Sequence, residues 1–510
     1  MCGIVLSADK LTFLLAWEAM GLASAGLVAF ENRERSVRKA TWIYLLTCHA
    51  GACALMLAGV LLDDPNAFLA AFFCAIVGFG LKIGFPPFHV WMPEAYPAMP
   101  APANAVMIPV GYFGLLRFFG PACLEAPYHT TAGVTLLTLG ALGALGGILF
   151  ALPQANLKKL LAYSSVENMG VVALGFGLAI LAADPSLSQS VRGTALAGAL
   201  SHILNHAFLK GALFLGAGSV QRQTGTLDLD RLGGLMKRMP KTGTLFTLNA
   251  VGLAGFPPLN GFLGELLIYL AAFNAVKSGH PLLIAAGFIV LIVLSLAGGL
   301  AAAVYCKAIG AAFLGEPHSA AAARATETPK RMWIAQLVLF VFSLAMIPGT
   351  VALAAQHGGL AAAEPVLVAA AIGGALALLT AALVAWRRHL CPRGAIKPSC
   401  PTWDCGYHAP TARMAYTGTA FTQPLADLFA SVLRPRKHLT PFKGHPAAPT
   451  DAALVTATDD RVLFGFWRPL FSLGSRLFLR AHLLQSGLLH LYILLILITV
   501  VVLLVAAFAS

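Results

Sequence analysis

Charged residues are scarce in this 510-residue chain, where they make up 11% of the positions against 58% for hydrophobic residues. Average soluble domains carry about 25% charged residues. This shortage excludes a large soluble core and indicates a membrane protein with several spans. The net charge of +13 does not indicate nucleic-acid binding, because most basic residues lie between apolar segments and in one polar stretch near the C-terminus. That distribution is typical of a membrane topology signal.

Short cysteine motifs are also missing. No Cys-x-x-Cys occurs, so an iron–sulfur or thioredoxin-type site has no support. Cysteine in an apolar helix is usually a small core residue, and four of the nine cysteines lie in such stretches: Cys48, Cys53, Cys74 and Cys306. Five residues near the C-terminus have an irregular spacing that favours a polar loop over a metal site: Cys391, Cys400, Cys405, His389 and His408. No cleavable signal peptide is expected, because Met1 leads almost directly into an apolar run.

The sequence contains many long apolar runs. About twenty apolar residues cross a bilayer as a helix, and the sequence contains twelve such runs. We therefore predict an all-α membrane protein with about twelve transmembrane helices. The runs lie near residues 8–30, 41–62, 67–91, 103–120, 131–152, 161–183, 194–219, 242–275, 281–314, 331–356, 365–386 and 488–508.

Lysine and arginine gather in alternate loops of this pattern, as the positive-inside rule requires. The rule places the N-terminus outside and the basic loops in the cytoplasm. Residues 92–103 are an exception on the inner side, because they contain no basic residue. The basic loops are 31–40, 153–160, 220–241, 315–331 and 387–487. The last of these has no sustained hydrophobic period and includes an amphipathic part around Phe464–Leu484, which favours a surface-lying or partner-binding segment over a second enzyme domain.

Two apolar segments are interrupted by the same four letters, GFPP, at Gly84–Pro87 after Lys82 and at Gly255–Pro258 before Glu265. Adjacent prolines cannot continue a helix, and non-helical backbone at membrane depth survives only where protein or a wet cavity satisfies it. A charge at that depth is by default functional. Two broken helices, each with one buried charge, indicate a duplicated ion-translocating unit. The breaks are expected at Pro86, Pro87, Pro257 and Pro258.

Glu18 lies well inside the first predicted helix, and Lys82 lies in the third. If the two pair, each keeps the other ionised, and the movement of one proton changes the affinity of its neighbour. This coupling is what a proton relay requires. A static ion pair that locks two helices together is the structural alternative.

The seventh predicted helix carries His202, His206 and Lys210 at positions i, i+4 and i+8. They therefore lie on one face, about 6 Å apart along the axis. Histidine changes its charge near neutral pH, so three titratable groups in register predict a proton wire with intervening water. The HxxxH spacing lacks the glutamate of HExxH, and we expect no metal here.

Glu265 follows the second break and is the natural end of this relay, either exchanging with Lys210 or opening to the outside. Glu167 and Lys307 are further candidates, but both lie nearer helix ends, where a side chain can instead reach the membrane surface. Lys158 and Lys159 precede a helix on the basic side and are expected to be topology anchors.

Seven segments are more specific in combination than any single motif. They are LLAWEAMGLAS, GFGLKIGFPPFHVWMPEAYPAMP, NLKKLLAYSSVENMGVVALG, HILNHAFLKGALFLGAGSV, FPPLNGFLGELL, PTWDCGYHAPTARMAYTGTAFTQPL and LLQSGLLHLYILLILITVVVLL. Together they resemble the antiporter-like membrane subunits of respiratory complex I and Mrp antiporters. The last two segments are typical of the branch of hydrogenase-4 component B and formate hydrogenlyase subunit 3. The resemblance covers nearly the whole chain.

The resemblance implies two inverted five-helix repeats, each with a broken helix, joined by a central hydrophilic axis. It implies that Glu18 and Lys82 are the glutamate–lysine pair of the family and that Glu265 is the charge of the second broken helix. His202, His206 and Lys210 are the connecting residues by the same comparison. This subunit is then expected to bind no redox cofactor, with electron transfer in partner proteins, and to move protons or sodium ions.

Two departures from the family pattern bear on function. Members begin several helices earlier, so we expect the first repeat to lack its opening helix. In NAVMIPVGYFGLLRF, Pro109 lies near the place of a family lysine, which puts the link from Lys82 to His202 in question. The predicted domains are an incomplete repeat (1–120), a second repeat (121–315), added membrane helices (316–386), the cytoplasmic segment (387–487) and a last helix (488–508).

These features predict an ion-translocating subunit of a membrane-bound hydrogenase or complex I-like oxidoreductase in a prokaryotic inner membrane. The expected partners are other membrane subunits, a peripheral redox arm, the lipid bilayer and protons or sodium ions, without nucleic acid. Two alternatives stay open: a stand-alone or Mrp-type cation/proton antiporter, and a structural scaffold whose relay has decayed.

Overall fold

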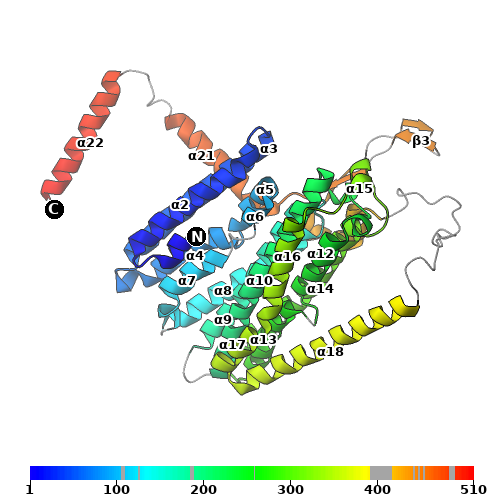
Figure 1. The fold of residues 1–510 in the computed structure, drawn as a ribbon. Coiled ribbons are helices and arrows are strands. Elements are labelled where there is room, and N and C mark those ends of the chain that lie inside the picture. Colours follow the sequence, from blue (N-terminus) through cyan, green and yellow to red (C-terminus); the bar gives the residue numbers. More distant parts are fainter. Residues whose placement is uncertain are drawn as a thin grey trace. The chain divides into compact units, whose positions relative to one another are not determined.

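The computed structural model divides the chain into two compact units, Met1–Thr458 and Asp459–Ser510. The residues that it describes are 1–104, 109–124, 127–183, 189–257, 259–390, 416–439, 443–445, 448–451, 454–481 and 489–509. Helices dominate both units (Figure 1).

The first unit begins with helices that pack in sequence order, α2 against α3, α3 against α4 and α4 against α7. Asp9 starts α2, because its carboxylate accepts a hydrogen bond from the backbone N–H of Thr12. The helices are α1 (Cys2–Leu6), α2 (Lys10–Val28), α3 (Arg35–Leu61), α4 (Phe68–Ile83), α5 (Met92–Ala98), α6 (Ala101–Asn104) and α7 (Pro109–Phe119).

The second set of helices surrounds α9 (Leu157–Leu181), in which every residue except Lys159 is buried. Gly143 and Gly147 of α8 lie against the backbone of Gly170 and Glu167 on α9. Small residues allow this close approach of two membrane helices, so α9 is held at the centre of the unit. This set comprises α8 (Tyr128–Ala151), α9 (Leu157–Leu181), α10 (Gln189–Thr224), α11 (Leu235–Arg238), α12 (Pro240–Leu253), α13 (Asn260–Val276) and α14 (Pro281–Phe313).

The rest of the first unit contains α15 (Ala320–Arg324), α16 (Lys330–Ala345), α17 (Ile347–Gly358), α18 (Leu360–Leu390), α19 (Gly418–Leu428) and α20 (Ala430–Leu433). Two short antiparallel pairs of strands follow, β1 (Arg436–Leu439) with β4 (Leu454–Ala457) and β2 (Lys443–His445) with β3 (Ala448–Asp451). The second unit contains a π-helical turn (Leu463–Trp467), α21 (Arg468–Ala481) and α22 (Leu489–Ala509). The polar stretch predicted over 387–487 is therefore divided between the two units.

Nine of the described helices are long and apolar enough to cross a membrane, and Val110–Phe119 and Asn260–Val276 are shorter apolar helices. Each of the twelve predicted runs contains a helix, and three of the runs are interrupted: 67–91 after α4, 242–275 between α12 and α13, and 331–356 between α16 and α17. The predicted all-α membrane architecture is confirmed.

Both GFPP sequences interrupt a helix. α4 ends before Gly84 and α12 ends before Gly255, and these glycines have φ of 89° and 72°. Glycine reaches this left-handed conformation without steric cost. The freed carbonyl of Gly80 accepts hydrogen bonds from the N–H groups of Gly84 and Phe85. Pro86, Pro87 and Pro257 lie in the breaks, whereas Pro258 lies outside the described residues.

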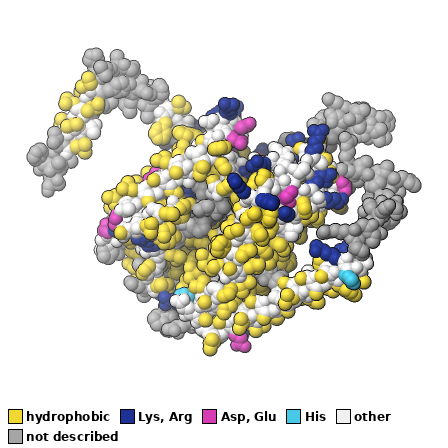
Figure 2. Space-filling model, in the orientation of Figure 1, with side chains coloured by type: hydrophobic (Ala, Val, Ile, Leu, Met, Phe, Trp, Pro, Cys, Tyr) yellow, Lys and Arg dark blue, Asp and Glu magenta, His cyan; other side chains and the backbone are white. Residues whose placement is uncertain are grey.

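Four of the predicted basic loops, 31–40, 153–160, 220–241 and 315–331, are joined to one another at one end of the first unit. Lys39 and Lys159 lie 2.8 and 3.9 Å from the carboxylate of Glu94, and Lys237 lies 2.9 Å from that of Glu316. Glu94 explains the exception at 92–103, because this loop contributes the acid that pairs with its basic neighbours. Lys and Arg side chains are seen near α15 in Figure 2, while hydrophobic side chains cover the helices below. We call this the basic end.

Candidate functional site

Lys82 lies in the last turn of α4 and is 5% exposed. Its ammonium donates a hydrogen bond of 2.7 Å to the hydroxyl of Tyr44 on α3. It also lies 5.0 Å from the centre of the Tyr44 ring and 5.6 Å from that of the Trp91 ring. Aromatic faces attract cations, more strongly where water is excluded. The two rings therefore hold the Lys82 charge beside the first break.

The expected contact between Glu18 and Lys82 is not formed. Glu18 on α2 instead lies 3.2 Å from Nδ1 of His49, and its side chain is 24% exposed. The reason lies in α3, which packs between α2 and α4 and supplies both partners, His49 to Glu18 and Tyr44 to Lys82. The Glu18 charge still acts on Lys82 electrostatically. A hollow lined by Trp17, Cys48 and Lys82, among others, opens beside the ammonium.

The three predicted residues of α10 are all buried, with exposures of 2% each at His202, His206 and Lys210. Nε2 of His202 lies 3.1 Å from Oδ1 of Asn168 on α9. Both ring nitrogens of His206 lack a hydrogen-bond partner among the described residues. Buried polar atoms are rarely left unpaired, so this ring is the natural place for a bound water.

Lys210 is held by two hydroxyl groups. Its ammonium donates hydrogen bonds of 3.0 Å to Oγ of Ser164 on α9 and of 3.2 Å to the hydroxyl of Tyr305 on α14. These two oxygens lie 2.6 Å apart and are themselves hydrogen-bonded. Three helices thus meet in a triangle of one amine and two hydroxyls.

Glu167 continues this group. It is 3% exposed and lies in the buried part of α9, so it does not reach a membrane surface. The side-chain amide of Asn168 donates to its carboxylate and to the carbonyl of Ser164. Since Asn168 also contacts His202, one amide joins Glu167 to the histidine of α10. Glu167 and Lys210 interact electrostatically.

Glu265 lies on α13 beside the second break. A Cβ atom added to Gly255 would lie 2.6 Å from the Glu265 carboxylate, so the acid packs directly against the interrupted backbone. Its charge also acts on Glu167 and Tyr305. The structure thus brings His202, Lys210, Glu167 and Glu265 together and places Lys82 and Glu18 in a separate group.

The two remaining buried lysines lie at the basic end. Lys307 is fully buried and donates to the carbonyl of Leu152 at 2.7 Å and to Oγ1 of Thr422 at 3.3 Å. Lys158 is 2% exposed and donates to the carbonyl of Met99 at 2.8 Å. Neither ammonium is exposed at the protein surface, and Lys158 on the basic side points into the protein. Lys159 is 31% exposed.

Sequence reasoning missed the neutral members of the site, Tyr44, Ser164, Asn168 and Tyr305. The polar letters SSVEN in an otherwise apolar helix are a signal for Ser164 and Asn168. The two tyrosines carry no such signal, because an aromatic residue in an apolar helix is most often part of the core. No group of three metal-ligating side chains occurs within the described residues, and the cysteines of 391–405 lie outside them.

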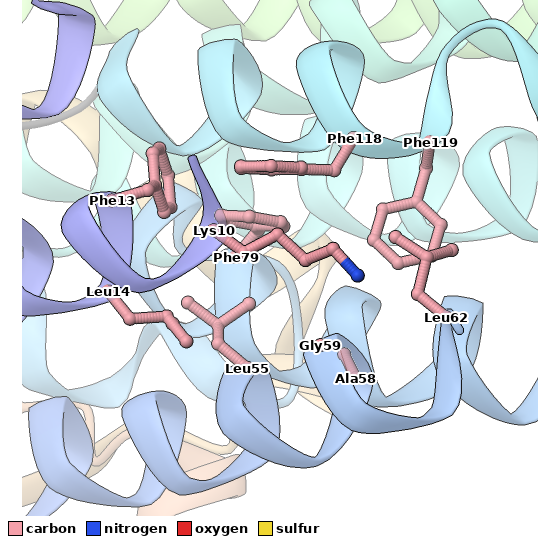
Figure 3. A pocket seen from close by; sticks show the side chains of 10 residues that line it. All are labelled: Lys10, Phe13, Leu14, Leu55, Ala58, Gly59, Leu62, Phe79, Phe118 and Phe119. Carbon is pink, nitrogen blue, oxygen red and sulfur yellow. The ribbon is translucent and has the colours of Figure 1, made fainter. Parts of the chain in front are cut away.

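A pocket at the other end of α2 is of a different kind (Figure 3). Phenylalanine, leucine, alanine and glycine residues line it, and Lys10 is the single charged residue among them. Lys10 is paired with Asp63, and no titratable chain leads from it into the bundle through the residues that line it. This pocket is therefore not part of the buried polar group.

A bundle of apolar helices with two GFPP breaks and a buried row of lysine, histidine and glutamate defines an antiporter-like membrane subunit. The same fold occurs in a chain of the membrane-bound sulfane sulfur reductase, an archaeal respiratory membrane complex. The TM-score is 0.71 at 21% identity, over 99% of this chain and 81% of that chain.

Sequence comparison identifies the family. The transmembrane family described as NADH:quinone oxidoreductase/Mrp antiporter matches residues 60–295. Hydrogenase-4 component B of Escherichia coli is 32% identical over 99% of this chain and 81% of its own length. Formate hydrogenlyase subunit 3 of the same organism is 33% identical over 72% of this chain and 61% of its own length. The chain belongs to the NADH:quinone oxidoreductase/Mrp antiporter family, as the sequence motifs predicted.

Proposed function

We propose that this chain is a proton-translocating membrane subunit of a multisubunit oxidoreductase, similar in role to a hydrogenase-4 or complex I membrane subunit. The observation that carries the proposal is the buried polar group of α9, α10 and α14. In it, Lys210 contacts Ser164 and Tyr305, and Glu167 is joined through Asn168 to His202. Ionisable residues inside a membrane bundle are costly and mark ion pathways.

Each hydroxyl in this group can accept a proton on its oxygen and release its own. A proton leaving the Lys210 ammonium would pass to Ser164, whose own proton moves to Tyr305 across the 2.6 Å contact. Along α10, about 6 Å separates successive titratable groups, which is too far for a direct hydrogen bond. Waters at the unpartnered nitrogens of His206 would bridge these gaps.

Lys82 would be the second station, coupled to Glu18 by charge rather than by contact. A shift of the Glu18 carboxylate relative to His49, its direct partner, would change the electrostatic field at Lys82. Redox events in partner subunits would drive this change, and protons would step through His202, His206 and Lys210 toward Glu265. α7 begins at Pro109, and residues 105–108, which precede it in the sequence, lie outside the described residues.

The proposal extends to the partner subunits and to the orientation of this subunit in the membrane. Its relatives are subunits of multisubunit membrane complexes, so we expect membrane and peripheral redox partners and electron-carrying cofactors in those partners only. The basic end would face the cytoplasm of a prokaryotic cell, by the positive-inside rule. The N-terminus would then lie outside and α19 on the cytoplasmic side.

The decisive experiment replaces Lys210 by methionine in the complete complex. Inverted vesicles are energised in turn with hydrogen, formate and NADH, and acidification of the lumen is followed with a fluorescent amine dye. We expect assembly and electron transfer to persist while acidification is lost. Unchanged acidification would refute the proposal.

The same vesicles separate the alternatives. An Mrp-type antiporter would release a preformed pH gradient when sodium is added, without any electron donor. A scaffold with a decayed relay would retain redox activity and unchanged acidification in the Lys210→Met, Glu265→Gln double variant.

A further inference from the structure

The segment PTWDCGYHAPTARMAYTGTAFTQPL, which is typical of the hydrogenase-4 component B branch, has no role in the proposed proton path. Its last part, YTGTAFTQPL, contains most of α19, which packs against α14 and the turn Leu229–Arg231 at the basic end. The proposed proton path does not use this helix. What it covers is Lys307.

α19 is attached through Asp230. The backbone N–H of Thr419 donates to Oδ1 of Asp230 at 2.8 Å, and its hydroxyl donates to the other carboxylate oxygen. Gly418 makes the approach close, because a Cβ atom there would lie 2.7 Å from Cβ of Leu229. Only glycine permits this contact.

Thr422 completes the surroundings of Lys307. Its hydroxyl donates to the carbonyl of Leu152 at 2.8 Å, and the same carbonyl accepts the Lys307 ammonium. Leu152 follows the last residue of α8, so its carbonyl is one of the groups that a helix end leaves without an intrahelical partner. Lys307, Thr422 and this carbonyl form a closed triangle, of which α19 supplies one corner.

The attachment buries little apolar surface. The fully buried residues of α19 are Gly418, Thr422 and Ala426, spaced four positions apart, and Leu425 packs partly buried against the core. Phe421 and Leu428 on the same helix are 43% and 72% exposed. Apolar burial is the main force that holds helices in place, and water can replace the hydrogen bonds that remain. The docking of α19 therefore depends to a large part on the hydrogen bonds to Asp230 and to the Leu152 carbonyl.

We propose that α19 is a movable cover over Lys307. When docked it seals the ammonium from water, and when released it opens Lys307 to the aqueous side of the basic end. The use of this opening as a proton entry rests on the proposed function; the cover itself does not.

The cover is tested by amine labelling of the full chain in lipid nanodiscs. Sulfosuccinimidyl acetate modifies accessible lysines, and peptide mass spectrometry gives a rate for each. Lys237, whose side chain is 70% exposed, and Lys82 at 5% are internal references. In the unchanged chain, Lys307 should react at least about tenfold more slowly than Lys237, because reaction requires local opening.

Two variants release the cover by different means. Gly418→Leu blocks the approach to Leu229, and Thr422→Val removes only a hydroxyl. Both should raise the labelling rate of Lys307 and leave that of Lys82 unchanged. Phe421→Ala, on the exposed face of the same helix, is the matched control and should change neither rate.

An unchanged labelling rate of Lys307 in both variants would refute the proposed cover. A parallel rise in the labelling rate of Lys82 would refute it as well, because it would mean that the whole bundle opens. Vesicle acidification by the Thr422→Val complex separates the two proposals. Faster labelling of Lys307 with unchanged acidification would support α19 as a cover and would refute its role in proton entry.

Discussion

The Lys210 ammonium and the Ser164 hydroxyl lie 3.0 Å apart, on two different helices, and the two residues are 46 positions apart in the sequence. Tyr305 completes the contact from α14, within hydrogen-bonding distance of both. This amine therefore has two alternative hydroxyl neighbours. In the proposed pathway, either hydroxyl could therefore take the proton from Lys210 directly when the other is removed.

Removal of the two hydroxyls should accordingly be non-additive. Ser164→Ala or Tyr305→Phe alone should lower the rate of vesicle acidification modestly, whereas the double variant should approach the Lys210→Met level. Neighbours in one hydrogen-bond network commonly show coupling of about 0.5–3 kcal/mol. Additive effects on the logarithm of the rate would contradict a shared role. Ser165→Ala, whose hydroxyl donates to its own helix at Leu161, is the control.

Lys82→Met should abolish redox-driven acidification while the complex still assembles, because the side-chain volume is kept and the charge is lost. Lys82→Arg should retain part of the activity, since a guanidinium also binds the faces of Tyr44 and Trp91. Acidification is measured with the fluorescent dye and assembly by native gel. Wild-type acidification in the methionine variant would exclude a role for Lys82.

Gly255 should tolerate no side chain. Gly255→Ala combines a φ of 72° with a Cβ atom 2.6 Å from the Glu265 carboxylate, so it should destabilise the fold and displace the acid. Gly279→Ala is the matched control, with a φ of 75° and nothing within 4 Å. Backbone strain alone costs about 1 kcal/mol, and both variants share it. A lower thermal midpoint in detergent for Gly255→Ala than for Gly279→Ala is expected; equal midpoints would mean that Glu265 does not pack against the break.

Asn260 should be the polar anchor of the second break. Its side chain bonds Asn205 of α10 and the carbonyl of Ser343 on α16, and Thr350 of α17 lies 3.5 Å away. Asn260→Ala should cost about 1–2 kcal/mol, the usual range for such bonds between membrane helices. Asn249→Ala is the control, because the Asn249 amide bonds only Leu245 of its own helix among the described residues. Chemical unfolding in mixed micelles measures both, and equal losses would refute the anchor.

The exposed pair Lys237–Glu316 should contribute little. The hydrogen bond and charge of Lys237 hold the pKa of the Glu316 carboxyl below its ordinary value. Any stability from this pair is therefore present above the ordinary pKa of a glutamate and is lost as the pH falls through the lowered value. Exposed pairs are worth little, so Glu316→Gln should leave the thermal midpoint at pH 7 nearly unchanged. A large drop at pH 7 that disappears in acid would show that the pair matters.

The sequence by itself determined the class of this protein. Apolar runs of membrane length, basic loops in alternation and two GFPP breaks act locally, because a helix must satisfy its own backbone in lipid and proline cannot do so. The candidate residues were identifiable from the sequence as well, because a titratable residue within an apolar run stands out. They are Lys82, His202, His206, Lys210, Glu167 and Glu265.

The partners of those residues were decided only by the tertiary structure. Glu18 faces His49 rather than Lys82, and Lys158 turns into the protein rather than to the surface. Tyr305 meets Lys210 from a helix 95 positions away. Such contacts depend on the rotation of each helix about its axis and on which helices are neighbours, and neither is encoded in the periodicity of a single apolar run.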